Sequence, residues 1–109
     1  MHINDIHGHR HRVTFGAQLM LDDHIVSHVL RTHNTLILKG FTIPHEVRRR
    51  QIGTILLHAL ERHYTTKSVT HITITQHDDF DAAAHTFLVK NGFIVRGKRA
   101  DKYLVENVF

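Results

Sequence analysis

The stretch that decides the fold covers residues 43–57, Ile-Pro-His-Glu-Val-Arg-Arg-Arg-Gln-Ile-Gly-Thr-Ile-Leu-Leu. It begins at the end of a largely apolar run over residues 35–43, which is predicted to be a buried strand that Pro44 stops. After it, residues recur at the spacing of one face of an α-helix: Ile52, Ile55, Leu56, Ala59, Leu60 and His63. The stretch therefore predicts a strand, a short basic loop and an amphipathic helix.

The junction between that loop and the helix has the features of an anion site. The first turn of a helix offers free N–H groups and the positive end of the helix dipole, which favour a phosphate. Gly53 allows close approach to the backbone, and Arg48, Arg49 and Arg50 add positive charge. The alternative is a basic loop that caps a helix on a solvated surface.

The rest of the chain supplies strands and a second helix around this stretch. Upstream we expect an antiparallel meander, with strands over residues 12–21 (broken or bulged at Gly16), 24–31 and 35–43. Downstream, a strand over residues 69–75 precedes a helix marked by Phe80, Ala83, Ala84, Phe87 and Asn91, and two closing strands cover residues 93–96 and 102–106. The order is β-β-β-α-β-α-β-β, an α/β chain with a mixed sheet, in which the first helix is a crossover between parallel strands.

Composition narrows the class of protein. The 109 residues fit a single domain over residues 1–109, and 41% apolar with 22% charged residues is ordinary globular composition. The absence of cysteine excludes disulfides, thiolate zinc sites and a cysteine nucleophile. The sequence shows neither a run long enough to span a bilayer nor a secretory signal at its start, so we expect a cytoplasmic protein without membrane contact.

The charge and the histidines leave several partners open. A net charge of +4 suits an anionic partner, either nucleic acid or a nucleotide-bearing cofactor, although 7% aromatic residues and no Trp disfavour a base-stacking platform. His7, His9 and His11 alternate among the 13 histidines, which permits a metal site. A His-rich tail or edge strand over residues 1–11 is the favoured interpretation, and no metal is predicted.

Two motifs in order resemble those of the GNAT superfamily of N-acetyltransferases. Residues 48–53 are similar to its acyl-CoA motif, Arg/Gln-x-x-Gly-x-Gly/Ala, with Arg48 first, Gly53 last and Gln51 where the family prefers Gly. If that position needs a positive φ, a residue other than Gly costs about 1 kcal/mol. The second motif, Asp81-x-x-Ala84-x-x-Phe87-Leu88-x-Lys90-Asn91-Gly92-Phe93, resembles Asn-x-x-Ala-x-x-Leu-Tyr-x-Lys-x-Gly-Phe.

The resemblance implies a fold, a cosubstrate and a site. It covers roughly residues 12–109 and implies a GNAT-like fold that lacks most of the usual first strand and two helices. It also implies acetyl-CoA as cosubstrate and an amine as acceptor, a protein lysine being one candidate. The expected cofactor-binding residues are Phe41, Thr42 and Ile43 for the pantetheine, and Arg48, Arg49, Arg50, Gln51, Ile52, Gly53 and Thr54 for the pyrophosphate.

The resemblance leaves the identity of the catalytic residues open. The family usually assigns the general acid to a Tyr at the position of Leu88, so that role is open, with Tyr103, His77 and His85 as candidates and His77 as the preferred base. The acidic residues Asp78, Asp79 and Asp81 either attract a cationic acceptor or cap the second helix, and capping is favoured.

Other functions and an assembly are also predicted. The alternatives to an N-acetyltransferase are a catalytically silent acyl-CoA-binding or partner-binding module and a basic nucleic-acid-binding protein, although no nucleic-acid motif supports the latter. Because the missing first elements would leave one side of the sheet uncovered, we expect a homodimer. Its interface is expected at Val13, Phe15, Leu19 and Leu21, with residues 105–109 as a second candidate.

Overall fold

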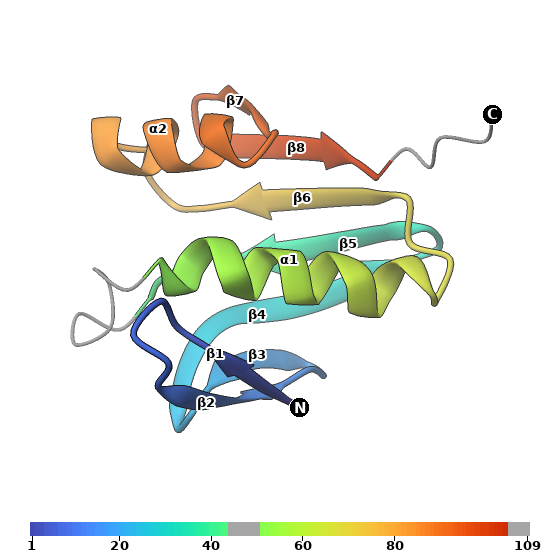
Figure 1. The fold of residues 1–109 in the computed structure, drawn as a ribbon. Helices are drawn as coiled ribbons and strands as arrows, with labels where there is room; N and C mark the ends of the chain where they lie inside the picture. The colour runs from blue at the N-terminus through green and yellow to red at the C-terminus, as the bar shows by residue number, and fades with distance from the viewer. Residues whose placement is uncertain (44–50, 105–109) are drawn as a thin grey trace, which may run out of the picture.

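The computed structural model describes residues 1–43 and 51–104 and has one mixed sheet with two helices (Figure 1). Neither helix in this part of the chain is long and apolar enough to cross a membrane. In chain order the elements are β1 (His2–Asn4), β2 (Arg10–Thr14), β3 (Gln18–Leu21), β4 (His24–Thr32), β5 (Thr35–Lys39), α1 (Ile52–Thr65), β6 (His71–Thr75), α2 (Ala82–Lys90), β7 (Ile94–Arg96) and β8 (Arg99–Tyr103).

The sheet has the strand order β1-β2-β3-β4-β5-β6-β8-β7. All neighbouring strands are antiparallel except β5 and β6, which run parallel with Leu36 beside Ile72 and Leu38 beside Ile74. This pair confirms the crossover that the helical spacing after residue 51 predicts. The N-terminal residues form a true edge strand, because β1 pairs with β2 through Ile3 and His11.

Both helices pack on one face of the sheet. That face carries the fully buried Leu36, Leu38, Ile72 and Ile74, which share one core with Leu56 and Leu60 of α1. On the same face Lys102 of β8 bonds to Glu61 of α1 and to the carbonyl of Asn91, the C-cap of α2. Within the described residues, the opposite face is therefore covered by no helix.

The predicted exposure of the first strands is wrong. Val13, Leu19 and Leu21 are buried, with at most 2% of their surface exposed, and Phe15 stacks on His63 of α1 at 4.2 Å between ring centroids. The cause is the curl of the sheet at its N-terminal end, which brings β1 against α1 (Figure 1). The predicted break at Gly16 is confirmed, since it separates β2 from β3, whereas the last strand starts at Arg99 and not at residue 102.

Candidate functional site

The parallel strands β5 and β6 part just beyond their last paired residues, and a pocket opens there. The Gly40 N–H donates to the Thr75 carbonyl at 2.6 Å, but the Thr42 N–H donates to Val26 of β4 at 2.9 Å. The change of direction occurs at Gly40, whose φ of 75° suits glycine. The pocket has a volume of about 630 Å³ and is lined by Phe41, Thr42, Ile43, Gln51, Gly53, Thr54, Gln76, Asp81, Ala83, Ala84, Phe87 and Lys90.

The first turn of α1 forms one wall of this pocket. Gln51, the residue before the helix, has a left-handed backbone (φ 53°, ψ 20°), and its side chain makes no capping bond. The first turn of α1 contains no acidic residue. The amides of Gly53 and Thr54 therefore receive no cap from Gln51, and the positive end of the helix dipole lies at the pocket.

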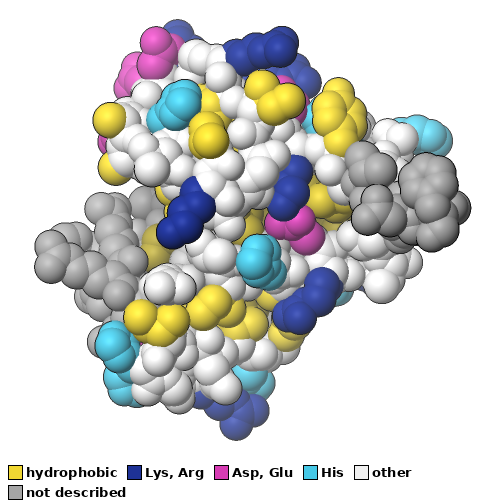
Figure 2. All heavy atoms as spheres, turned by 45° about the horizontal axis from the view of Figure 1, so that its top comes forward, with side chains coloured by type: hydrophobic (Ala, Val, Ile, Leu, Met, Phe, Trp, Pro, Cys, Tyr) yellow, Lys and Arg dark blue, Asp and Glu magenta, His cyan; other side chains and the backbone are white. Residues whose placement is uncertain are grey.

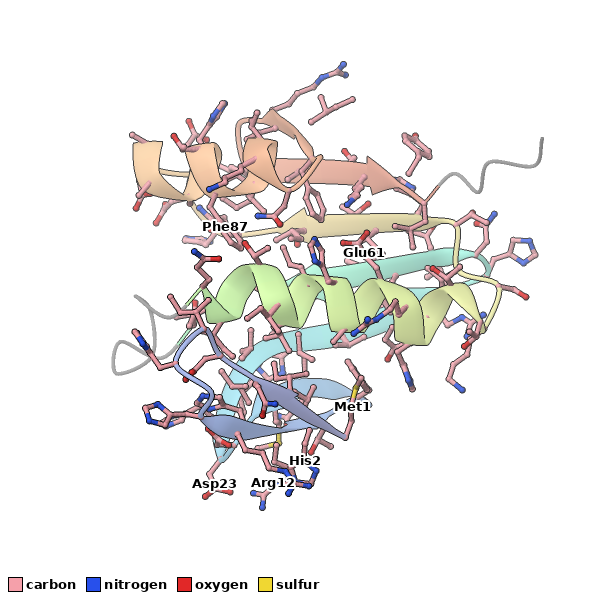
Figure 3. All side chains as sticks on the ribbon, in the orientation of Figure 1. Met1, His2, Arg12, Asp23, Glu61 and Phe87 are labelled. Carbon is pink, nitrogen blue, oxygen red and sulfur yellow. The ribbon has the colours of Figure 1, made fainter. Side chains whose placement is uncertain are left out.

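Gly53 allows α1 and α2 to approach each other closely. A Cβ at this position would lie 2.9 Å from Cζ of Phe87, too close for two carbon atoms, and 3.6 Å from Cγ1 of Ile43. Figure 3 shows Phe87 reaching from α2 toward the start of α1. The Phe87 ring also stacks on Phe41 at 6.2 Å between centroids, so one aromatic pair joins both sides of the pocket.

A sequence profile of the acetyltransferase (GNAT) family matches residues 4–93, which is most of the chain. The chain belongs to the GNAT acetyltransferase family. No curated protein sequence matches it.

Solved structures of similar shape support the same fold. PaiA N-acetyltransferase from Thermoplasma acidophilum, solved with coenzyme A, is 18% identical with a TM-score of 0.62, over 79% of this chain and 58% of that protein. Ard1 from Thermoplasma volcanium is 13% identical with a TM-score of 0.63, and the match covers 82% of this chain and 70% of Ard1. Tetrahymena GCN5 is 12% identical with a TM-score of 0.62, and the match covers 91% of this chain and 70% of GCN5. At these identities the likeness shows the fold alone, and the chain spans 58% of the length of PaiA.

The structure brings six of the ten expected cofactor-binding residues of this GNAT chain to the pocket: Phe41, Thr42, Ile43, Gln51, Gly53 and Thr54. Ile52 points elsewhere, because its side chain is fully buried in the core. Arg48, Arg49 and Arg50 lie outside the described residues. Sequence reasoning did not assign the other six lining residues to the cofactor site: Gln76, Asp81, Ala83, Ala84, Phe87 and Lys90. The signals that point to them are the carboxyl end of a parallel strand and the helical spacing from Ala83 through Phe87 to Lys90.

The three expected catalytic candidates differ in their position relative to the pocket. His77 is exposed and directly follows Gln76, a pocket residue. His85 is exposed on α2 and directly follows Ala84, another pocket residue, and neither histidine lines the pocket itself. Tyr103 pairs with His71 at the other end of β6, so it is not brought to the pocket. Leu88 is only 3% exposed and packs in the core.

The acidic residues before α2 divide into two groups. Asp81 accepts a hydrogen bond from the Ala84 N–H at 2.8 Å, which confirms its expected role as the N-cap of α2. Asp78 and Asp79 are exposed, and neither makes an ion pair with another residue of the described part of the chain. Capping thus accounts for Asp81 and leaves two carboxylates beside His77.

One of the N-terminal histidines, His11, is buried between two carboxylates. The ring of His11 is bonded on both sides, through Nε2 to Asp5 at 2.8 Å and through Nδ1 to Asp22 at 2.9 Å. Burial alone would lower the pKa of His11, but its bonds to the two carboxylates raise it above the ordinary 6.5. Across residues 1–43 and 51–104, no group of three acidic or histidine side chains is arranged to hold a metal.

Proposed function

We propose that this chain is an acetyl-CoA-dependent N-acetyltransferase that binds its cosubstrate in the pocket between β5, β6 and the two helices. The observation that carries the proposal is the position of the pocket. It opens where the parallel strands part and faces the first turn of α1, to which the side chain of Gln51 gives no capping bond. A helix end of this kind favours the pyrophosphate of CoA, and the gap between the strands can accept an extended chain.

Backbone groups supply most of the expected contacts to CoA. Successive N–H groups of an extended chain point to opposite sides, and the Thr42 N–H is already directed to Val26 of β4. The Phe41 N–H is then directed toward the pocket, where it can bond to the pantetheine as an added strand would. The amides from Gln51 to Thr54, together with the arginines at positions 48–50, would hold the pyrophosphate.

The proposed reaction is attack of an uncharged amine on the thioester carbonyl of acetyl-CoA. A C–N bond forms, the C–S bond breaks, the amine gives up a proton and the thiolate takes one. We propose His77 as the base, because it follows the carboxyl end of β6, where the two parallel strands part, whereas His85 follows the pocket residue Ala84 on α2. The neighbouring Asp78 and Asp79 would favour the approach of a cationic amine, such as a lysine side chain.

A specific observation favours a second function, a catalytically silent acyl-CoA-binding module. Leu88 stands where many members of the family carry the Tyr acid, and its side chain is buried and apolar. The third alternative, nucleic-acid binding, has less support. The sequence contains no nucleic-acid motif, and on the one face drawn in Figure 2 the Lys and Arg side chains lie apart among neutral and hydrophobic ones.

Calorimetric titration with acetyl-CoA, followed by an assay of released CoA thiol with a lysine peptide or spermidine, separates these functions. We expect saturable binding and turnover. The His77→Ala variant should keep its affinity and lose turnover at least tenfold, whereas His85→Ala should change neither. Binding without turnover on any amine would favour the silent module. Salt-sensitive binding of DNA or RNA without CoA binding would favour the third function.

A further inference from the structure

The sheet face opposite the helices, here called the open face, carries side chains in three rows across the strands. The pairing register places them level with one another. The middle row holds Leu30, Ile37, Thr73, Asp101 and Ile94. The row nearer the pocket, the basic row, holds His28, Lys39, Thr75, Arg99 and Arg96, and the row at the far end holds Thr32, Thr35, His71 and Tyr103.

Large apolar side chains of the open face meet solvent. Leu30 is 47% exposed, Ile94 56% and Tyr103 63%, and Ile25, which pairs with Met20 further along the same face, is 47% exposed. These four are a majority of the exposed large apolar side chains in the described part of the chain. Scattered apolar residues on a surface are ordinary, but a gathering on one sheet face marks a surface that a partner covers.

The charges of the open face are ordered. Lys39, Arg99 and Arg96 lie in the basic row, whereas Asp101 is the only carboxylate in the three rows. Asp101 is already bonded, to Arg99 at 2.9 Å, to Thr73 at 2.7 Å and to His71 at 2.9 Å. The face therefore has unbalanced positive charge at one end, and at the other Tyr103 stacks on His71 at 4.4 Å between centroids.

We infer that a second copy of this chain covers the open face, related by a twofold axis that lies in the face and runs across the strands along the middle row. Rotation about this axis places each middle-row residue over its own copy, so that Leu30 meets the partner's Leu30. It also turns the basic row over the far row. Arg99 then meets the partner's Tyr103, a cation over an aromatic ring, and no cation meets a cation. The two Asp101 carboxylates face each other, but each is already bonded to Arg99, Thr73 and His71 of its own chain.

Other arrangements and occupants fit the face less well. A twofold axis along the strands at β6 would place Lys39 over the partner's Arg99, and like charges facing each other across an interface are costly. Nucleic acid would be attracted to the basic row, but it would lie against Leu30 and Ile37 without burying them in an apolar contact. The inference does not depend on the proposed acetyl transfer, because it rests only on this surface.

Light scattering behind a sizing column measures the mass of the protein in solution and so tests whether a dimer forms through the open face. We expect the wild type to have about twice the chain mass of 12.7 kDa at tens of micromolar. Leu30→Glu should be monomeric with an unchanged circular-dichroism spectrum, whereas Val89→Glu, at a half-exposed position on α2, should remain dimeric. A monomeric wild type would overturn the inference, as would a dimer that Leu30→Glu leaves intact.

Cross-linking tests the direction of the axis. Because the chain contains no cysteine, Leu30→Cys introduces a single thiol, and the twofold axis brings it near its own copy. Facing sheets lie about 10 Å apart, so a bis-maleimide of about that span should join the two thiols. Val89→Cys should stay uncrosslinked. If the protein is dimeric but Leu30→Cys gives no covalent dimer, the proposed axis is wrong.

Discussion

Gln51 sets the local geometry at the start of α1. Its backbone is left-handed, a conformation that costs a residue with a side chain about 1–2 kcal/mol. The family resemblance places a glycine at this position, and the observed φ of 53° gives the physical reason. The chain thus keeps the backbone shape of the motif and carries strain at the wall of the proposed CoA site.

Replacement of Gln51 by glycine should relieve this strain. After subtraction of the greater entropy of glycine in the unfolded chain, we expect the free energy of unfolding to rise by about 0.5–1 kcal/mol. Urea denaturation of the wild type and of Gln51→Gly measures this difference in the free energy of unfolding. Gln76→Gly is the matched control, since Gln76 lacks a positive φ, and it should not be stabilised. A loss of stability in Gln51→Gly would contradict the strain argument.

His11 should make stability depend on pH. A protonated ring donates to both Asp5 and Asp22, and the folded pKa lies above the ordinary 6.5. The stabilisation is therefore complete below about pH 6.5 and is lost as the pH rises through the raised pKa. The pKa of Asp22 is shifted the other way: burial alone would raise it, but hydrogen bonding to His11 lowers it. The stabilisation that ionised Asp22 gives to the fold is therefore lost as the pH falls through its lowered pKa.

Denaturation between pH 6 and 9 tests the role of His11. In His11→Gln the decline in stability with rising pH should become shallower, whereas exposed His85→Gln should keep the wild-type decline. Equal slopes in the wild type and His11→Gln would show that the ring does not carry the proton. The sequence did not predict this cluster, because the two carboxylates lie at 6 and 11 residues from His11 and only the pairing of β1, β2 and β3 brings them together.

The two helices that enclose the pocket are joined by Lys102. Its Nζ lies 2.8 Å from Oε1 of Glu61 on α1 and 2.8 Å from the carbonyl of Asn91 after α2. Figure 3 shows Glu61 between α1 and β6, where its Oε2 is buried with no hydrogen-bond partner in the described residues. The Asn91 side chain continues the connection to Thr54, a pocket residue, at 3.3 Å.

Removal of Lys102 should leave a largely buried carboxylate without its cation. We expect Lys102→Met to lower the free energy of unfolding by roughly 3 kcal/mol, and the double variant Glu61→Leu, Lys102→Met to recover most of that loss. Chemical denaturation of the three proteins provides the comparison. If the two changes were additive in the double variant, Glu61 and Lys102 would not be coupled.

At the level of elements, local pattern predicted most of the order. The helical spacing from Ile52 to Leu60 and the alternation over residues 69–75 placed α1 and β6 correctly. What local pattern could not predict was which side of the first strands is covered. Val13, Leu19 and Leu21 were expected to meet solvent, but the curl of the sheet around α1 buries them, and the open face lies on the other side.

For the molecule as a whole, one core spans the sheet and both helices. Leu60 is fully buried in that core beside Ile72 and Ile74. Leu60→Ala should therefore cost about 2–5 kcal/mol, the range for large-to-small changes in a core. Val89→Ala, at a half-exposed position of α2, should cost much less. A loss below about 0.5 kcal/mol for Leu60→Ala in urea would place this helix face outside the core.

Amide chemical shifts of ¹⁵N-labelled protein, recorded during titration with acetyl-CoA, test whether CoA binds where β5 and β6 part. We expect saturable shifts at Phe41 and at residues 51–54, with little change at Tyr103 on the open face. The same titration with pantetheine alone should move Phe41 and leave residues 51–54 nearly unchanged. No saturable shift, or shifts confined to the open face, would contradict the proposed site.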